Sequence, residues 1–143
     1  MNVRLKKEVG SVRDFNRYYT NVLGLLDRHI LDSAFSLSEV RVLYEIANTE
    51  NCTARMLSET LLLDPGYLSR MLKSFQKSGL IRKHRSLSDG RAQVLTLSPA
   101  GREKIDALDA RSDEQIARLL APLPEEQRAE LVRCMKKIKQ ILR

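Results

Sequence analysis

Apolar residues recur every three or four positions along most of the chain, which is the spacing of one buried helix face. Each stripe alternates with polar positions that would face solvent. The stripes predict six helices, in residues 9–31, 36–47, 53–61, 65–78, 99–120 and 124–142.

Several helix ends are marked by residues that satisfy free backbone groups. Ser36 and Glu39 form the sequence of a capping box, in which hydroxyl and carboxylate bond to each other's backbone amides. Thr53 is a suitable N-cap, and Asp64-Pro65 combines an N-cap with a favoured first helical residue. Gly79 suits the left-handed residue that ends a helix. The helix at residues 65–78 therefore has both ends defined, and Leu68, Met71, Leu72 and Phe75 form its predicted buried face.

A hairpin follows these helices. Residues 80–86 and 91–98 have the composition of two strands, and Asp89-Gly90 between them is a strong turn signal. Two short helices followed by a hairpin are the layout of a winged helix-turn-helix, a DNA-binding architecture. The predicted fold class is thus mainly α with a small β-wing.

The positive charge of the chain indicates that its partner is a polyanion. The 143-residue chain has a net charge of +7, and residues 53–98 hold eight basic but only three acidic residues. Ribosomal and membrane-surface proteins share a basic composition, so charge alone does not decide the function. No apolar run reaches membrane-spanning length and no signal peptide is apparent, so we expect a cytoplasmic protein.

The two ends of the chain carry more apolar surface than a small core needs. We expect one domain, residues 1–143, with a winged helix-turn-helix core at about 34–98. Residues 1–33 and 99–143 would bury their apolar stripes against a second copy, which predicts a homodimer with two-fold symmetry.

Five short segments together make the chain resemble the MarR family of bacterial transcription regulators over nearly its whole length. They are Leu57-Ser-Glu-Thr-Leu61, Asp64-Pro-Gly-Tyr-Leu-Ser-Arg70, Lys77-Ser-Gly-Leu-Ile-Arg82, Ser88-Asp-Gly-Arg-Ala92 and Leu95-Thr-Leu-Ser-Pro-Ala-Gly101. The opening Val12-Arg-Asp-Phe-Asn-Arg-Tyr-Tyr-Thr20 also resembles the regulator half of MarR proteins fused to a GNAT-type acetyltransferase. The chain stops at Arg143 without that second half, so no acetyltransfer is expected.

The resemblance implies a homodimer on a pseudo-palindromic operator, with half-sites about one helical turn apart. Occlusion of a promoter by a bound dimer is the simpler mechanism, so we expect a repressor, and an activator is the alternative. The helix that begins at Asp64 would enter a major groove, and Arg91 at the wing tip would lie in or beside the minor groove. Arg70 would bind a guanine, most other cations would bind phosphates, and Asp89 would support the turn. The predicted DNA-binding residues are Pro65, Gly66, Tyr67, Ser69, Arg70, Lys73, Ser74, Lys77, Arg82, Lys83, Arg85, Asp89 and Arg91.

Family members commonly release DNA when a small molecule or an oxidant acts on them. An aromatic or phenolic effector would suit aromatic walls with a few polar groups, and the candidate residues are Tyr18, Tyr19, His29, Phe35, Arg41 and Tyr44. Core packing is the alternative role of Tyr19 and Phe35. Cys52 and Cys134 are the candidate redox residues, and a structural role is the alternative for both.

Two other classes of function remain for comparison. An enzyme would need a phosphate-binding glycine loop, a nucleophile–base set or a metal motif, and none is found, so we expect no catalytic residue, no metal and no cofactor. A non-catalytic winged-helix adaptor that binds protein or RNA is the second alternative. An adaptor would not need Arg70, Lys73 and Arg91 on one basic face.

Overall fold

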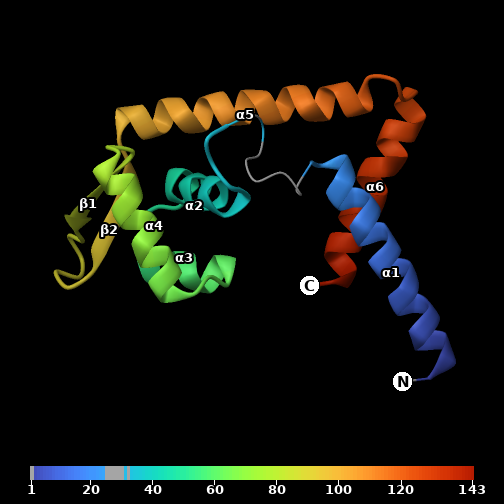
Figure 1. The fold of residues 1–143 in the computed structure, drawn as a ribbon, viewed down its shortest axis with the longest axis horizontal. Coiled ribbons are helices and arrows are strands. Elements are labelled where there is room, and N and C mark those ends of the chain that lie inside the picture. Colours follow the sequence, from blue (N-terminus) through green and yellow to red (C-terminus); the bar gives the residue numbers. More distant parts are fainter. Residues whose placement is uncertain (1, 25–30, 32) are drawn as a thin grey trace. The chain divides into compact units, whose positions relative to one another are not determined.

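The computed structural model describes residues 2–24, 31 and 33–143 of the chain (Figure 1). These residues form six α-helices and one antiparallel hairpin, which confirms the predicted fold class. The elements in chain order are α1 (Val3–Val22), α2 (Leu37–Asn48), α3 (Ala54–Leu61), α4 (Pro65–Lys77), β1 (Ile81–Arg85), β2 (Gln93–Leu97), α5 (Pro99–Leu120) and α6 (Glu125–Ile141).

Helix α1 differs from the predicted helix 9–31 at both ends. It begins at Val3 because the Asn2 side chain caps it and accepts a hydrogen bond from the Leu5 amide at 2.8 Å. It ends at Val22, and Gly24 then adopts a φ of +63°, which does not continue a right-handed helix. Residues 25–30 of the predicted helix lie outside the described part of the chain.

The other predicted caps are confirmed. Ser36 and Glu39 form both bonds of the capping box, at 3.3 Å and 2.7 Å. The Thr53 hydroxyl accepts from the Met56 amide, and Asp64 accepts from the Tyr67 amide at 2.8 Å. Gly79 has a φ of +73° after the last turn of α4. The polar caps therefore fix where α2, α3 and α4 start, and Gly79 fixes where α4 stops.

The chain divides into two compact units, Met1–Ile105 (unit 1) and Asp106–Arg143 (unit 2). The core of unit 1 lies among α2, α3, α4 and the hairpin. Its most deeply buried side chains are Leu43, Leu57, Leu68, Leu72, Leu95, Ile105, Val42 and Cys52. In α2, Val42, Leu43 and Ile46 face the core, whereas Tyr44 is exposed.

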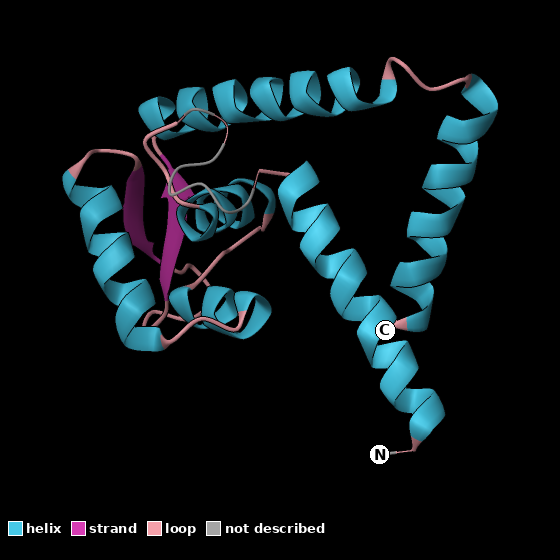
Figure 2. Ribbon diagram, turned by 45° about the vertical axis from the view of Figure 1, so that its right-hand side comes forward, coloured by secondary structure: helices cyan, strands magenta, loops and turns pink. Residues whose placement is uncertain are grey.

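The hairpin attaches to this core along both strands (Figure 2). Ile81 pairs with Leu97 and Arg85 with Gln93, and β2 packs on α2 and α3 while β1 contacts α4. Ile81 is the only buried residue of β1, so the rest of that strand presents polar side chains to solvent. The hairpin thus extends the exposed face of α4.

The start of α5 is joined to the end of α4 by a small polar junction in unit 1. Ser98 is buried, its hydroxyl donates a hydrogen bond to the Gly79 carbonyl, and it accepts one from the Gly101 amide at 3.0 Å. The Ser98 amide donates to the Leu80 carbonyl at 2.9 Å. A Cβ on Gly101 would lie 2.0 Å from that same carbonyl oxygen, so only glycine fits there.

Candidate nucleic-acid interface

Helix α4 has two chemically distinct faces. Leu68, Met71, Leu72 and Phe75 are buried, as the sequence predicted. The remaining face is exposed and carries the predicted DNA-binding residues of this helix, namely Pro65, Gly66, Tyr67, Ser69, Arg70, Lys73, Ser74 and Lys77. A helix that is held by one face and offers hydrogen-bond donors on the other can bind in the major groove of DNA.

The amino end of α4 is kept open by a glycine. A Cβ on Gly66 would lie 3.1 Å from the Asp64 carboxylate and 3.6 Å from Nη1 of Arg70. The Arg70 guanidinium therefore reaches back toward the first turn, as long side chains on helices do. Gly66 leaves room for another molecule to approach this cation and the helix end.

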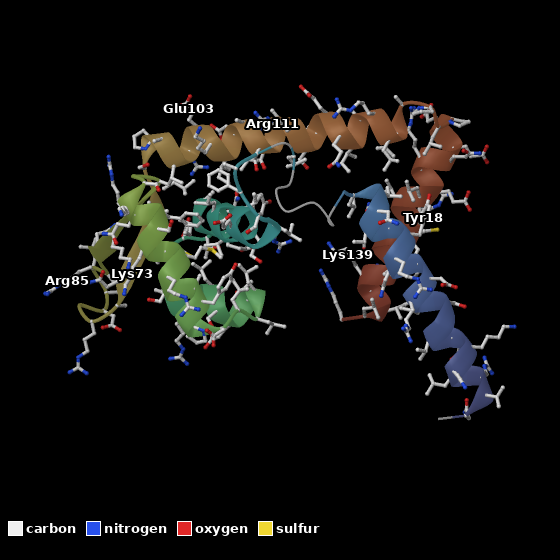
Figure 3. All side chains as sticks on the ribbon, in the orientation of Figure 1. Tyr18, Lys73, Arg85, Glu103, Arg111 and Lys139 are labelled. Atoms are coloured by element: carbon white, nitrogen blue, oxygen red, sulfur yellow. The ribbon has the colours of Figure 1, made fainter. Side chains whose placement is uncertain are left out.

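Strand β1 adds three exposed cations, Arg82, Lys83 and Arg85. Lys83 and Ser69 line the same open hollow of about 400 Å³, together with Arg55 of α3. Side chains from α3, α4 and β1 therefore border one surface. Lys73 of α4 and Arg85 of β1, both labelled in Figure 3, belong to these neighbouring elements.

The wing tip, residues 86–92, is held by its own hydrogen bonds. The Ser86 hydroxyl accepts from the amides of Ser88 and Asp89, both at 3.3 Å, and the Ser86 amide donates to the Ala92 carbonyl at 2.9 Å. Asp89 accepts from the Arg91 amide at 3.0 Å. Asp89 thus has the geometry expected of a residue that supports the turn, and the Arg91 side chain stays exposed.

The cations of this surface have no ionic partner within the described part of the chain. Arg4, Arg17, Arg41 and Arg55 each pair with a carboxylate on their own helix. No ion pair involves the exposed cations of α4, β1 and the wing tip, which are Arg70, Lys73, Lys77, Arg82, Lys83, Arg85 and Arg91. Seven uncompensated charges on adjoining elements create a field that attracts a polyanion.

Three further residues that the sequence did not single out lie on or beside this candidate interface. Arg55 borders the hollow beside Lys83, and the Ser86 hydroxyl organises the wing tip. Leu87 lies inside this loop and is fully exposed. The sequence does carry a signal for Leu87, because it is an apolar residue between two serines in an otherwise polar turn.

The structure does not gather the candidate effector residues into one described site. Tyr18 is exposed, and Tyr19 stacks on Phe15 with ring centroids 5.5 Å apart. Phe35 packs edge-to-face on the core residue Phe75, at 6.3 Å, so core packing accounts for it.

Two other effector candidates lie on α2, where Arg41 pairs with Glu45 at 3.5 Å and Tyr44 is exposed. Arg41 lines a shallow hollow with Leu37, Ser38, Thr60, Leu61 and Leu63, but none of the other described candidates lines it. His29 lies outside the described residues.

The two cysteines have opposite environments. Cys52 is fully buried beside the hairpin, and burial, with a smaller contribution from Glu45, raises the pKa of its thiol to about 11. Because the thiolate is the reactive form, this environment suppresses oxidation and alkylation of Cys52. Cys134 on α6 is exposed.

The described residues contain neither a metal-binding cluster nor a membrane-spanning helix. Among residues 2–24, 31 and 33–143, no three His, Cys, Asp or Glu side chains gather in a way that could hold a metal ion. Within the same residues, no helix has the length and apolarity needed to cross a membrane.

Comparison with known proteins agrees with the architecture. Residues 35–92 match the model of the MarR family. The HTH-type transcriptional regulator BilQ of Clostridium symbiosum is 27% identical over 93 residues, which cover 65% of this chain and 65% of BilQ. The match therefore spans somewhat less than two thirds of that relative.

Solved structures share the fold at low identity. Streptococcus pneumoniae FabT, solved in complex with DNA, superposes with a TM-score of 0.74 at 20% identity and covers 97% of this chain and 95% of its own. Streptomyces coelicolor PcaV, solved with its natural ligand, gives 0.63 at 18% identity, with 92% and 91% covered. The part of this chain from α2 to the wing tip thus matches the MarR family model, and the chain shares its fold with solved winged helix transcription regulators.

Proposed function

We propose that the chain is a homodimeric, sequence-specific DNA-binding regulator that acts in the cytoplasm and represses transcription by occupying an operator. The observation that carries the proposal is the exposed face of α4 with the adjoining β1 and wing, where seven cations lack an ionic partner among the described residues. The DNA complex of FabT, which has the same fold, supports it by analogy.

The contacts divide by chemistry. Gly66, Tyr67, Ser69 and Arg70 lie near the amino end of α4, where the recognition helices of helix-turn-helix proteins contact base edges. The cations further along α4 and on β1 would bind phosphates, which sets affinity rather than sequence preference. Arg91 would bind in the minor groove, whose negative potential attracts a guanidinium.

Exposed apolar side chains on the terminal helices support the homodimer. Helix α6 has no buried residue, and Ile138, Ile141 and Leu142 are exposed. In α1, Val12 and Phe15 are exposed as well. Such stripes are stable in water when a second copy covers them.

A small aromatic or phenolic effector is proposed to release the DNA. PcaV, which shares the fold, was solved with its natural ligand. On this chain Arg41 and Tyr44 offer a cation and a phenol on the exposed side of α2. An aromatic carboxylate that binds there should raise the melting temperature of the wild type and have a smaller effect on Arg41→Ala.

Selection of bound sequences from random double-stranded DNA tests the proposed function. We expect one pseudo-palindromic sequence to be enriched and to bind selectively at physiological salt in an anisotropy titration. A dimeric, folded protein that shows no sequence preference, or that prefers RNA or a protein, would overturn the proposal in favour of an adaptor.

A further inference from the structure

Leu87 is an apolar side chain at the end of a cationic wing. Its relative exposure is 107%, so it makes no packing contact with the protein. A single exposed leucine is common on protein surfaces and has no meaning by itself. Its position in the loop and the charges beside it are what make this leucine informative.

The loop holds Leu87 outward without using its side chain. The Ser86 hydroxyl bonds to the amides of Ser88 and Asp89, which encloses Leu87 in a tight turn. The Asp89 carboxylate and the Ser86–Ala92 bond fix the rest of the tip. Because every one of these bonds comes from the backbone, a serine or an aspartate, replacement of Leu87 should leave the turn intact.

The surroundings of Leu87 match the chemistry of a DNA groove. Arg85 and Arg91 are exposed near it and have no ion pair within the described residues, while the carboxylate of Asp89 is engaged with the Arg91 amide. The walls of the minor groove are apolar deoxyribose faces bounded by phosphates, and leucine is among the side chains that proteins insert there. An apolar tip flanked by cations is complementary to that arrangement.

We propose that Leu87 enters the minor groove at the edge of the operator and contacts its sugar walls, while the neighbouring arginines bind the phosphates or the groove floor. The proposal rests on the DNA-binding function proposed above and adds an apolar contact to it. Because this contact releases no counterions, it contributes affinity that is independent of salt.

Anisotropy titrations of the selected operator over a range of salt concentrations test the contact. Leu87→Ala should weaken binding about tenfold, since burial of a leucine side chain is worth about that factor or more, and the slope of log K against log salt should not change. Leu87→Met, which keeps an apolar side chain, should retain most of the affinity. Arg91→Ala should lower the slope by about one for each wing.

Two results of that titration would overturn the proposal. One is wild-type affinity in Leu87→Ala, and the other is a loss of salt slope as large as that of Arg91→Ala, because the effect would then be electrostatic. Leu62→Ala, an exposed leucine at the end of α3, is the matched control and should bind like the wild type. Absence of selective binding by the wild type would instead overturn the proposed function itself.

Base substitution locates the contact in the groove. Guanine adds an amino group to the minor groove, whereas an inosine·cytosine pair leaves that groove like an A·T pair. The A·T pairs that flank each half-site are replaced by inosine·cytosine or by G·C. The ratio of wild-type affinity to Leu87→Ala affinity should be the same with inosine·cytosine as with A·T, and it should approach one with G·C. An equal ratio on all three operators would place Leu87 outside the minor groove and overturn the proposal.

Discussion

Arg70 and Lys73 are both exposed cations on one helix, yet their positions predict different roles. Arg70 reaches back toward the amino end beside Gly66, and Lys73 lies one turn further along. We expect Arg70→Ala to lose about 1 to 3 kcal/mol of discrimination at one base pair, whereas Lys73→Ala should weaken all sequences alike. Binding to the operator and to its single-base variants measures both. If Arg70→Ala lost the same affinity on the operator and on all of its single-base variants, Arg70 would be a phosphate contact.

Cys52 gives the folded state a dependence on pH in the alkaline range. The thiol pKa rises from 9.0 to about 11 on folding. Below pH 9 the thiol is neutral in both states, and the stabilisation is complete. Between pH 9 and about 11 the unfolded chain loses its proton first, so the free energy of unfolding should fall, by about 2 to 3 kcal/mol in all.

Urea denaturation from pH 8 to 11 measures that decline. Cys52→Ala should be less stable at pH 8 but should lack this component of the pH dependence, while Cys134→Ala should keep it. At pH 8, a thiol reagent should label the exposed Cys134 and leave Cys52 unmodified until the protein unfolds. Rapid labelling of Cys52 in the folded protein would contradict the buried environment.

At the scale of elements, the junction between α4 and α5 depends on Gly101. A methyl group there would lie 2.0 Å from the Leu80 carbonyl oxygen, so Gly101→Ala must separate the start of α5 from the end of α4. We expect a loss of about 2 kcal/mol or more in the free energy of unfolding. Thermal denaturation measures this loss of stability, and an anisotropy titration should show weaker operator binding.

Gly10→Ala is the matched control for that substitution. Gly10 lies inside α1 with nothing within 4 Å of the added methyl. Alanine in the interior of a helix should therefore stabilise the protein by about 0.5 to 1 kcal/mol. Destabilisation of similar size at both sites would mean that the contact with Leu80 is not the cause.

At the scale of the whole molecule, the proposed homodimer predicts that operator binding depends on dimerisation. Ile138 on α6 is 42% exposed and is a member of the apolar stripe proposed to contact a second copy. Ile138→Asp would place a carboxylate in that contact, so it should shift the sedimentation equilibrium toward monomer and weaken operator binding about a hundredfold. Lys136→Asp on the same helix should remain a dimer. A fully dimeric Ile138→Asp would exclude this face.

The sequence predicted the local structure of unit 1 closely, because the signals there act over a few residues. The capping residues Ser36, Thr53 and Asp64 satisfy amides three positions away, and the buried stripe of α4 follows from helical spacing. The prediction failed for the bounds of α1, where Asn2 extends the helix at one end and the chain turns at Gly24 at the other. Neither residue belongs to the apolar stripe that was used to place the helix.

What the sequence determined by itself is the set of elements, the face of α4 that is buried and the excess of positive charge on residues 53–98. All of these follow from short-range spacing and composition. Only the tertiary structure decided which side chains lie together, because these contacts join distant parts of the chain. It showed the Ser98–Gly79 junction, the packing of Phe35 on Phe75, the burial of Cys52 beside the hairpin, and the absence of ionic partners around the cations of α4, β1 and the wing among the described residues.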